Sequence, residues 1–308
     1  MLPNQVGLND PKAVRIAYLI IAHHRPDSIV RMVRRLYAPA HVFLIHYDAN
    51  SPDADLQRIA EGLKEFENVK FLKRFKCRWG DVGNMRGVLA GIGELAKLDF
   101  IHDYAIQVSG LDYPIKSNAQ IQERLTSAAG RSFMEAAPWP IPNWLNGRAI
   151  KRIENYHIHL PFPHWFRRAG WQPAWQHLTI PMKRKIPGGL NPYFGSAFWY
   201  LHRNCLQYIH EYTMRHPEYV DFFTHTLLSD ESLYQTLVMN SPLAPTVNTR
   251  TLTRVQWRPP WPGIMTMEDL SQLRQSDCLF ARKFDPVVDG RILDELDSIN
   301  EPAFSLSR

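Results

Sequence analysis

Blocks of apolar and polar positions alternate along the first third of the chain. Apolar runs of strand length are followed by stretches in which apolar residues recur every three or four positions, the spacing of one face of a helix. Strands that alternate with helices build a mainly parallel sheet, so the pattern predicts an α/β fold. We predict strands over residues 14–22, 42–46, 69–72 and 104–109, and helices over residues 27–37, 53–66 and 81–97.

Polar residues directly follow three of these predicted strands. His23 and Asp48 come after the first two, and a turn that contains Ser109 and Asp112 follows the last. In a parallel sheet, ligands bind beyond the carboxyl ends of the strands, so we expect these side chains to border a binding site. For His23, a hydrogen-bonded structural role at the strand end is an equal alternative.

The pattern changes between residues 136 and 192, where helical periodicity is weak and prolines are frequent. A long stretch without regular structure is usually functional, and indole rings suit the C–H faces of sugars. The alternative is that the tryptophans of this stretch pack a small satellite core. They are Trp139, Trp144, Trp165, Trp171 and Trp175.

Regular patterns return after Phe194. We predict strands over residues 196–201, 251–257 and 278–281, and helices over residues 205–215, 230–239, 267–273 and 291–299. No internal repeat or flexible linker interrupts the chain. We therefore expect a flexible N-terminus at residues 1–12 and a single domain at 13–308, with 136–192 as an insertion between residues 13–135 and 193–308.

The composition is that of a globular protein, with 308 residues of which 45% are hydrophobic and 21% charged. The longest apolar run, residues 16–22, is far shorter than the ~20 residues that cross a bilayer, and residues 1–12 do not resemble a signal sequence. We therefore expect a cytoplasmic protein. Cys77, Cys205 and Cys278 lack the spacing of a zinc site, so we predict buried free thiols.

The net charge of +6 is compatible with an anionic partner. Basic residues gather on the predicted helix at 27–37, in the run 70–78 and in the cluster 182–185. No nucleic-acid-binding motif accompanies them, so we do not expect a nucleic-acid partner. The cluster at 182–185 would be explained by a peripheral contact with the inner face of an anionic membrane that carries a lipid-linked acceptor. Solvated surface is the alternative for this cluster and for the run 70–78.

The stretch 227–237 (Leu-Leu-Ser-Asp-Glu-Ser-Leu-Tyr-Gln-Thr-Leu) joins two acids to an amphipathic helix. Ser229 is a natural N-cap, which would place Asp230 and Glu231 in the first helical turn, where the helix dipole favours ionised carboxylates. An ionised carboxylate can accept a proton, although the two acids could equally do no more than cap the helix. A distant basic segment, residues 280–284 (Phe-Ala-Arg-Lys-Phe), could oppose a phosphate-bearing ligand.

Several segments together resemble the core-2/I-branching N-acetylglucosaminyltransferase and peptide O-xylosyltransferase family (glycosyltransferase family 14), as a bacterial-type member. Their order and spacing extend from about residue 14 to residue 300. The matching segments are 17–23 (Ala-Tyr-Leu-Ile-Ile-Ala-His), 42–48 (Val-Phe-Leu-Ile-His-Tyr-Asp), 78–81 (Arg-Trp-Gly-Asp), 108–115 (Val-Ser-Gly-Leu-Asp-Tyr-Pro-Ile), 195–201 (Gly-Ser-Ala-Phe-Trp-Tyr-Leu), the Ser-Asp-Glu segment and 280–284.

The resemblance implies a GT-A-type glycosyltransferase fold and an inverting reaction with a UDP-sugar. Glu231 matches the family's catalytic base, whereas Asp230 is expected to cap or orient. Many GT-A enzymes hold a divalent metal with an Asp-x-Asp motif, but residues 46–48 (His-Tyr-Asp) supply one acid there, and the resembled family is metal-independent. No cofactor or metal is therefore expected.

The resemblance also assigns the remaining site residues. Arg282 and Lys283 match the diphosphate-binding cations, and Arg258, or less favourably Arg254, would add another. Donor contacts fall on Asp48, Trp79, Ser109 and Asp112, and acceptor contacts on Glu135 and Trp257. Residues 79–81 read Trp-Gly-Asp where the family has Trp-Gly-Gly, and Asp81 could serve as a helix cap.

The implied activity is transfer of GlcNAc or xylose from a UDP-sugar to a hydroxyl of a glycan, a lipid-linked saccharide or a protein. Residues 13–135 would bind the nucleotide-sugar, and residues 193–308 would carry the base and the diphosphate-binding cations. Two other readings remain, a non-catalytic carbohydrate-binding protein and a basic protein that binds membranes or nucleic acids.

Overall fold

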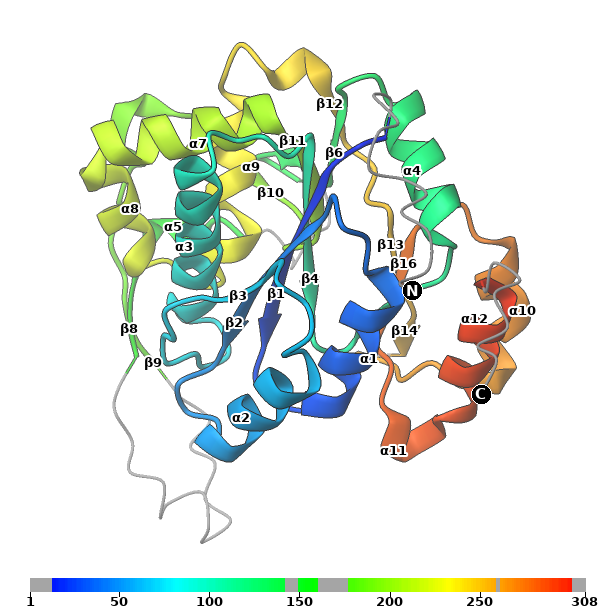
Figure 1. Ribbon diagram of the computed structural model, residues 1–308. Coiled ribbons are helices and arrows are strands. Elements are labelled where there is room, and N and C mark those ends of the chain that lie inside the picture. Colours follow the sequence, from blue (N-terminus) through cyan, green and yellow to red (C-terminus); the bar gives the residue numbers. More distant parts are fainter. Residues whose placement is uncertain (1–12, 142–148, 160–176, 259–260, 301–308) are drawn as a thin grey trace, which may run out of the picture.

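The computed structural model describes residues 13–141, 149–159, 177–258 and 261–300 (Figure 1). The expected flexible N-terminus at 1–12 lies outside these residues, as do Trp144, Trp165, Trp171 and Trp175. Within the described part of the chain, no helix is long and apolar enough to cross a membrane.

A seven-stranded sheet forms the centre of the molecule (Figure 1), in the order β12-β6-β11-β4-β1-β2-β3. Each described pair of neighbours is parallel except the two that β11 makes, so the predicted α/β class with a mainly parallel sheet is confirmed. The strands are β1 (Ile16–Ala22), β2 (Val42–Tyr47), β3 (Val69–Phe71), β4 (Tyr104–Ser109), β6 (Ser132–Met134), β11 (Trp199–His202) and β12 (Val247–Asn248).

The register of the sheet aligns the predicted strand-end residues. Ile21 of β1 lies opposite His46 of β2 and opposite Ser109 of β4. The residues that follow these positions therefore emerge at one edge of the sheet. His23, Asp48 and the turn at 109–112 meet there, as the sequence pattern predicted.

Helices cover both faces of the sheet (Figure 1), and the side chains of β1 divide between two apolar clusters. Tyr18 and Ile20 belong to one cluster and Ala17 and Leu19 to the other, as expected for a strand buried on both faces. The first face is covered by α1 (Pro26–Leu36), α2 (Asp53–Gly62), α4 (Asn118–Ser127), α10 (Leu270–Gln275) and α12 (Arg291–Asn300), and the second by α3 (Gly83–Lys97), α7 (Arg203–Arg215), α8 (Pro217–Thr224) and α9 (Leu233–Met239).

Four smaller sheets accompany the central sheet in the described part of the chain. A three-stranded sheet in the order β13-β16-β5 carries the basic segment, and three two-stranded ribbons accompany it. The three-stranded sheet contains β13 (Thr253–Val255), β16 (Phe280–Arg282) and β5 (Asp112–Pro114). The ribbons pair β7 (Ala137–Pro138) with β10 (Tyr193–Phe194), β8 (Tyr156–His159) with β9 (His177–Ile180), and β14 (Trp257–Arg258) with β15 (Trp261–Pro262).

The described part of residues 136–192 contains regular structure. Besides β7, β8 and β9 it includes the short helix α5 (Lys151–Glu154) and a 3₁₀ turn, η2 (Pro187–Gly189). Trp139 is half-buried and packs edge-on against Phe194, with ring centroids 6.3 Å apart. Trp139 therefore packs in a core, which is the alternative that the sequence analysis gave to sugar binding.

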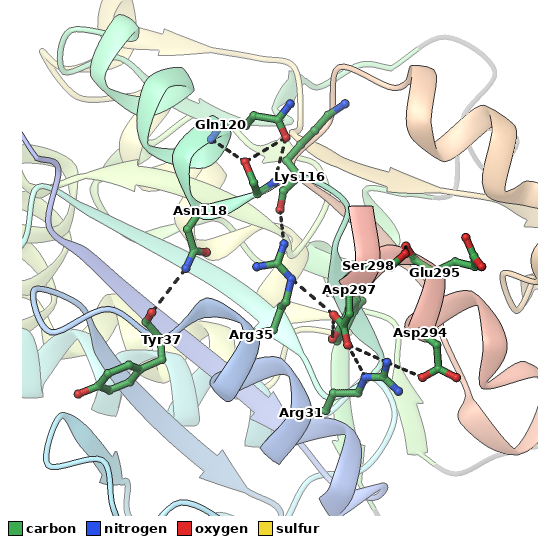
Figure 2. A network of polar contacts seen from close by, with 12 residues as sticks. Arg31, Arg35, Tyr37, Lys116, Asn118, Gln120, Asp294, Glu295, Asp297 and Ser298 are labelled. Atoms are coloured by element: carbon green, nitrogen blue, oxygen red, sulfur yellow. Dashed lines mark hydrogen bonds and ion pairs between the residues drawn. The ribbon is translucent and has the colours of Figure 1, made fainter. Parts of the chain in front are cut away.

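The last helix is fastened to the first by a cluster of charges, shown in Figure 2. The Arg31 guanidinium donates to the carboxylates of Asp294 and Asp297, both at 2.7 Å, and Arg35 lies 3.5 Å from Asp297. The hydroxyl of Tyr113, in β5, donates to the same Asp297 carboxylate at 2.6 Å. This cluster holds α12 against α1 and against the strand that begins with Asp112.

The three cysteines are free, as predicted, but only Cys205 is fully buried. Cys77 and Cys278 are partly exposed, so the expectation of burial is wrong for them. Cys77 lies in a loop that approaches Asp48, and its backbone N–H donates to the Asp48 carboxylate at 2.9 Å.

Candidate active site

Glu231 lies on a 3₁₀ turn, η3 (Ser229–Glu231), that is separated from helix α9 by Ser232, whose φ of −144° is not helical. The predicted N-cap at Ser229 is wrong, because its hydroxyl makes no hydrogen bond with the described residues and Leu228, whose φ is 55°, holds the N-cap position of the turn. The helix dipole therefore does not account for the charge state of Glu231.

A glycine loop fixes this turn from the other side. The backbone N–H of Leu228 donates to the carbonyl of Gly80 at 3.0 Å. Gly80 has a φ of 78°, and a Cβ there would approach the Leu227 side chain to 2.8 Å, so only glycine fits without strain. Trp79, which precedes Gly80 in the chain, is 59% exposed. The Trp-Gly pair thus supports the segment that carries Glu231.

The carboxylate of Glu231 is paired with Arg152, which the sequence analysis did not identify. Arg152 Nη1 donates to Glu231 Oε2 at 2.8 Å, and the two side chains are 16% and 32% exposed. The carbonyl of Arg152 also accepts the N–H of Leu227 at 3.2 Å, which ties α5 to the segment before η3. The short α5 therefore positions the Glu231 carboxylate.

Burial raises the pKa of Glu231 to about 7, and the neighbouring Asp230 carboxylate adds to the rise. Arg152 acts in the opposite direction, because its positive charge and its hydrogen bond favour the ionised carboxylate. A carboxyl group with a pKa near neutrality is suited to accept a proton during a reaction and to release it afterwards.

Asp230 has a different hydrogen-bond partner from Glu231. Its buried carboxylate accepts a 3.4 Å hydrogen bond from the side-chain amide of Asn84, near the start of α3, and burial raises its pKa. Asp81 does not cap α3 at its N-cap position, but its carboxylate accepts the N–H of Gly83, at the helix start, at 2.8 Å. Both acids hold α3 and the adjacent loops in place.

Gly195 brings a second acid to Glu231. Its N–H donates to the carbonyl of Glu231 at 2.9 Å, and a Cβ at this position would overlap the carbonyl of Glu135. Glu135 is exposed, yet partial desolvation raises its pKa and its charge raises the pKa of Glu231. Glu135 and Glu231 therefore border the same region.

Ser109, Asp112 and Arg282 form one tightly bonded group. Arg282 Nε donates to Asp112 Oδ1 at 2.9 Å, and Asp112 also accepts the N–H and the hydroxyl of Ser109, both at 2.7 Å. The Asp112 side chain is fully buried, and the Arg282 guanidinium lies over the ring of Phe198 at 3.9 Å. Much of the charge of Arg282 is therefore balanced within the protein.

Lys283 differs from its neighbour. Its half-buried ammonium makes no hydrogen bond or ion pair with the described residues, and burial together with the charge of Arg282 lowers its pKa. Its charge also lowers the pKa values of His23 and His24, whose rings stack 4.1 Å apart. Lys283 is thus a cation near the carboxyl ends of the strands, and it contacts no acidic side chain among the described residues.

Asp48 uses its carboxylate within the protein. Oδ1 accepts the N–H groups of Asn50 at 2.8 Å and of Cys77 at 2.9 Å, and the residue is only 6% exposed. It shapes the loop beyond β2. Among the described residues there is no cluster of three or more His, Cys, Asp or Glu side chains able to hold a metal, and metal independence stays a prediction.

The two candidate arginines for a further cation are both engaged. Arg258 Nη2 lies 3.1 and 3.0 Å from the oxygens of Asp269, and its Nη1 donates to the carbonyl of Ile264. Arg254 donates to the side chain of Gln272 at 2.8 Å. Trp257, next to Arg258, is 65% exposed. The choice between the two arginines stays open.

The segment 195–198 connects the acidic and the cationic groups. Gly195 is bonded to Glu231, and Phe198 lies under Arg282. Three residues of extended chain span at most about 11 Å, so this short segment links the backbone of Glu231 to the guanidinium of Arg282. An acceptor of protons on one side and a cation on the other are what group transfer from a phosphate ester needs.

Two solved structures show a slight similarity to this chain. One is with the mannosyltransferase Ktr4p of S. cerevisiae, at 13% identity and a TM-score of 0.39, covering 80% of this chain and 72% of that one. Another is with the 4-diphosphocytidyl-2C-methyl-D-erythritol synthase of Anaerococcus prevotii, at 9% identity and a TM-score of 0.32, covering 72% and 90%. Scores this low support no further conclusion.

Sequence comparison is more informative. The chain is 25% identical to "Xylosyltransferase oxt" of Drosophila pseudoobscura pseudoobscura over 93% of its length and 33% of the relative, and 25% identical to "Xylosyltransferase 1" of Rattus norvegicus over 94% and 36%. It thus spans about a third of the length of these relatives. The sequence model of the family described as "Core-2/I-Branching enzyme" matches residues 16–276. The chain therefore belongs to the Core-2/I-Branching enzyme family.

Proposed function

We propose that this chain is an inverting, metal-independent glycosyltransferase with a GT-A-type fold, which moves GlcNAc or xylose from a UDP-sugar to an acceptor hydroxyl. The observation that carries the proposal is Glu231, a carboxyl group with a pKa of about 7 that is held by Arg152 beside a region bordered by Arg282 and Lys283. Membership of the family and relatives named xylosyltransferases support it.

In the proposed reaction Glu231 is the general base. The acceptor hydroxyl gives its proton to the Glu231 carboxylate while its oxygen forms a bond to the anomeric carbon. The bond from that carbon to the diphosphate breaks on the opposite face, and its electron pair stays on the departing phosphate oxygen. Attack from one face and departure from the other invert the configuration at the anomeric carbon.

The departing diphosphate gains negative charge, which must be stabilised. Lys283 is suited to this task, because its ammonium has no described partner to give up. Arg282 is bonded to the buried Asp112, so its main contribution is to fix the strand and the turn at 109–112. Asp48, Ser109 and Asp112 would then shape the nucleoside site through the loops that they hold, rather than through free carboxylates.

Exposed aromatic side chains support a saccharide acceptor. Trp79 and Trp257 are 59% and 65% exposed, and Glu135 borders the base. An indole face stacks well on a sugar ring. The same tryptophans favour a second candidate function, a carbohydrate-binding protein without transfer activity.

A two-part experiment separates the two functions. Thermal unfolding is followed with UDP, UDP-GlcNAc, UDP-xylose, UDP-glucose and a GDP-sugar, because a ligand that binds the folded state raises the midpoint. Release of UDP from the stabilising donor is then measured with and without oligosaccharide acceptors. Stabilisation by one UDP-sugar with acceptor-dependent UDP release supports the transferase. Binding of oligosaccharides without any nucleotide effect supports the carbohydrate-binding protein.

A further inference from the structure

The ribbon formed by β8 and β9 carries exposed apolar side chains that belong to no described core. Ile158 lies directly opposite Leu178, and Ile180 is two residues beyond Leu178. Side chains two apart on a strand share a face, so these three lie together. They are 36%, 45% and 38% exposed, and Met182, which follows, is 51% exposed. We call these four residues the hairpin face.

The inner end of the ribbon is firmly attached to the body of the protein. Arg184 stacks over the ring of Tyr156 at 4.3 Å and donates to the carbonyls of Asn155 at 3.0 Å and His225 at 2.8 Å. The N–H of His157, a buried residue, donates to the same His225 carbonyl. The exposure of the hairpin face therefore does not come from a detached ribbon, and Figure 1 shows β8 and β9 extending from the body below α5 and α8.

Two basic residues follow the hairpin face along the chain and have no acidic partners among the described residues. Lys183 and Lys185 are exposed, and neither forms an ion pair with the described residues. The sequence contains no Asp or Glu between residues 155 and 210, so the ribbon and its flanks bring positive charge without compensation from their own segment. Exposed aliphatic groups beside uncompensated lysines are the combination by which peripheral proteins bind anionic bilayers.

We propose that the hairpin face docks on an anionic lipid surface. The aliphatic side chains enter the boundary between headgroups and acyl chains, and Lys183 and Lys185 lie against the negatively charged headgroups. A nucleic acid would use the lysines and leave the aliphatic groups in water, which is why the apolar half of the surface favours lipid. The aliphatic side chains contribute little binding free energy by themselves, so the charges of Lys183 and Lys185 are needed as well, and the binding is reversible. The proposal does not depend on the transfer activity.

The test is sedimentation of the full chain with two kinds of vesicle. One contains phosphatidylcholine alone, and the other contains phosphatidylcholine with about 30% phosphatidylserine, which makes its surface anionic. The wild-type chain is expected to bind the second and not the first. Each lysine near the surface contributes about five-fold to binding, so K183E/K185E should weaken it by at least about 25-fold. L178S/I180S should weaken it by roughly ten-fold at unchanged lipid charge.

Two matched controls carry the same changes elsewhere. K70E/K73E removes two exposed lysines from the first basic run, and I101S/M214S removes two exposed apolar side chains, 44% and 70% exposed. I101S/M214S should bind vesicles within about two-fold of wild type. K70E/K73E should do so as well, once the general effect of net charge has been measured at raised ionic strength and subtracted. Equal loss in K70E/K73E and K183E/K185E would overturn the proposal, because binding would then follow total charge.

Other occupants of the hairpin face give different results. If residues of the same chain cover it, L178S/I180S will lower the midpoint of thermal unfolding and leave vesicle binding unchanged. If a second copy covers it, light scattering will detect a dimer that the same variant dissociates. Preference for a nucleic-acid duplex over vesicles would identify an electrostatic surface. Each of these outcomes contradicts docking on lipid.

Discussion

The acidic and the cationic sides of the proposed site are built in opposite ways. Glu231 is paired with Arg152 and yet has a raised pKa, because burial and the nearby acids outweigh the pairing. On the other side Arg282 is paired with a fully buried acid, whereas Lys283 has no described partner. The group that would exchange a proton, Glu231, has a pKa of about 7. The cation that would meet the ligand, Lys283, makes no hydrogen bond or ion pair with the described residues.

The comparison assigns the largest effect to the base. Glu231→Gln keeps the shape and the hydrogen bond from Arg152 but removes the proton-accepting charge, so kcat for transfer should fall by at least about 100-fold. UDP affinity and the far-UV circular dichroism spectrum should be unchanged. Transfer at the wild-type rate by the purified variant would show that another group accepts the proton.

The cationic side is tested by two substitutions that should differ in kind. Lys283→Ala should weaken UDP binding and lower kcat by about 10- to 100-fold, the range expected for loss of a charged hydrogen bond, without a change in stability. Arg282→Ala leaves the buried Asp112 unpaired and should lower the free energy of unfolding by about 3 kcal/mol. Calorimetry of UDP binding and urea unfolding measure the two effects.

Asp112→Asn in the Arg282→Ala background is the control for this assignment. The buried charge is then absent, so much of the lost stability should return. If Lys283→Ala leaves UDP affinity unchanged in a folded protein, the unbonded cation is not the diphosphate contact.

A smaller effect is expected from Arg152. Arg152 lowers the pKa of Glu231, so Arg152→Gln should raise it further above about 7. Only the ionised base is active, and activity is lost as the pH falls through this pKa. The acidic limb of the kcat profile should therefore move to higher pH, with a loss of several-fold at pH 7 and recovery near pH 8.5.

Lys151→Gln is the matched control, because it removes a neighbouring charge on α5 that is paired with Glu154. Its profile should coincide with that of the wild type. A loss in Arg152→Gln that is the same at every pH would instead indicate a purely structural role for Arg152.

The smallest expected effect is that of chelation. If Lys283 and not a bound ion faces the diphosphate, EDTA should leave the transfer rate unchanged within experimental error. A loss in EDTA that Mg²⁺ or Mn²⁺ reverses would place a metal near Asp48 and would remove the contrast between the two sides.

The periodic parts of the fold could be predicted from the sequence, because their signals are local. The βαβ pattern of the first third and the meeting of His23, Asp48 and residue 109 at one edge follow from strand length and spacing. Helix α4 was missed although Ser117 and Gln120 form a capping box, a local signal that the sequence shows. Helix α8 was missed as well.

The site itself depends on contacts between distant segments. Arg152 lies 79 residues before Glu231, on a four-residue helix that has no periodic pattern of its own. Ser229 is a good N-cap by type, but the hydrogen bond from Leu228 to Gly80 sets a different start for the turn. The ion pair of Arg258 with Asp269, 11 residues away, also has no local sequence signal, and its role as a further cation stays a prediction.

The charge cluster between α1 and α12 has a consequence for the order of folding during synthesis. Arg31 and Asp297 are 266 residues apart, and Arg25 in the loop after β1 pairs with Asp285 across 260 residues. The first strand and its loop leave the ribosome long before either partner exists. The contacts that close the region around Lys283 therefore cannot form until residues 285–297 have been made.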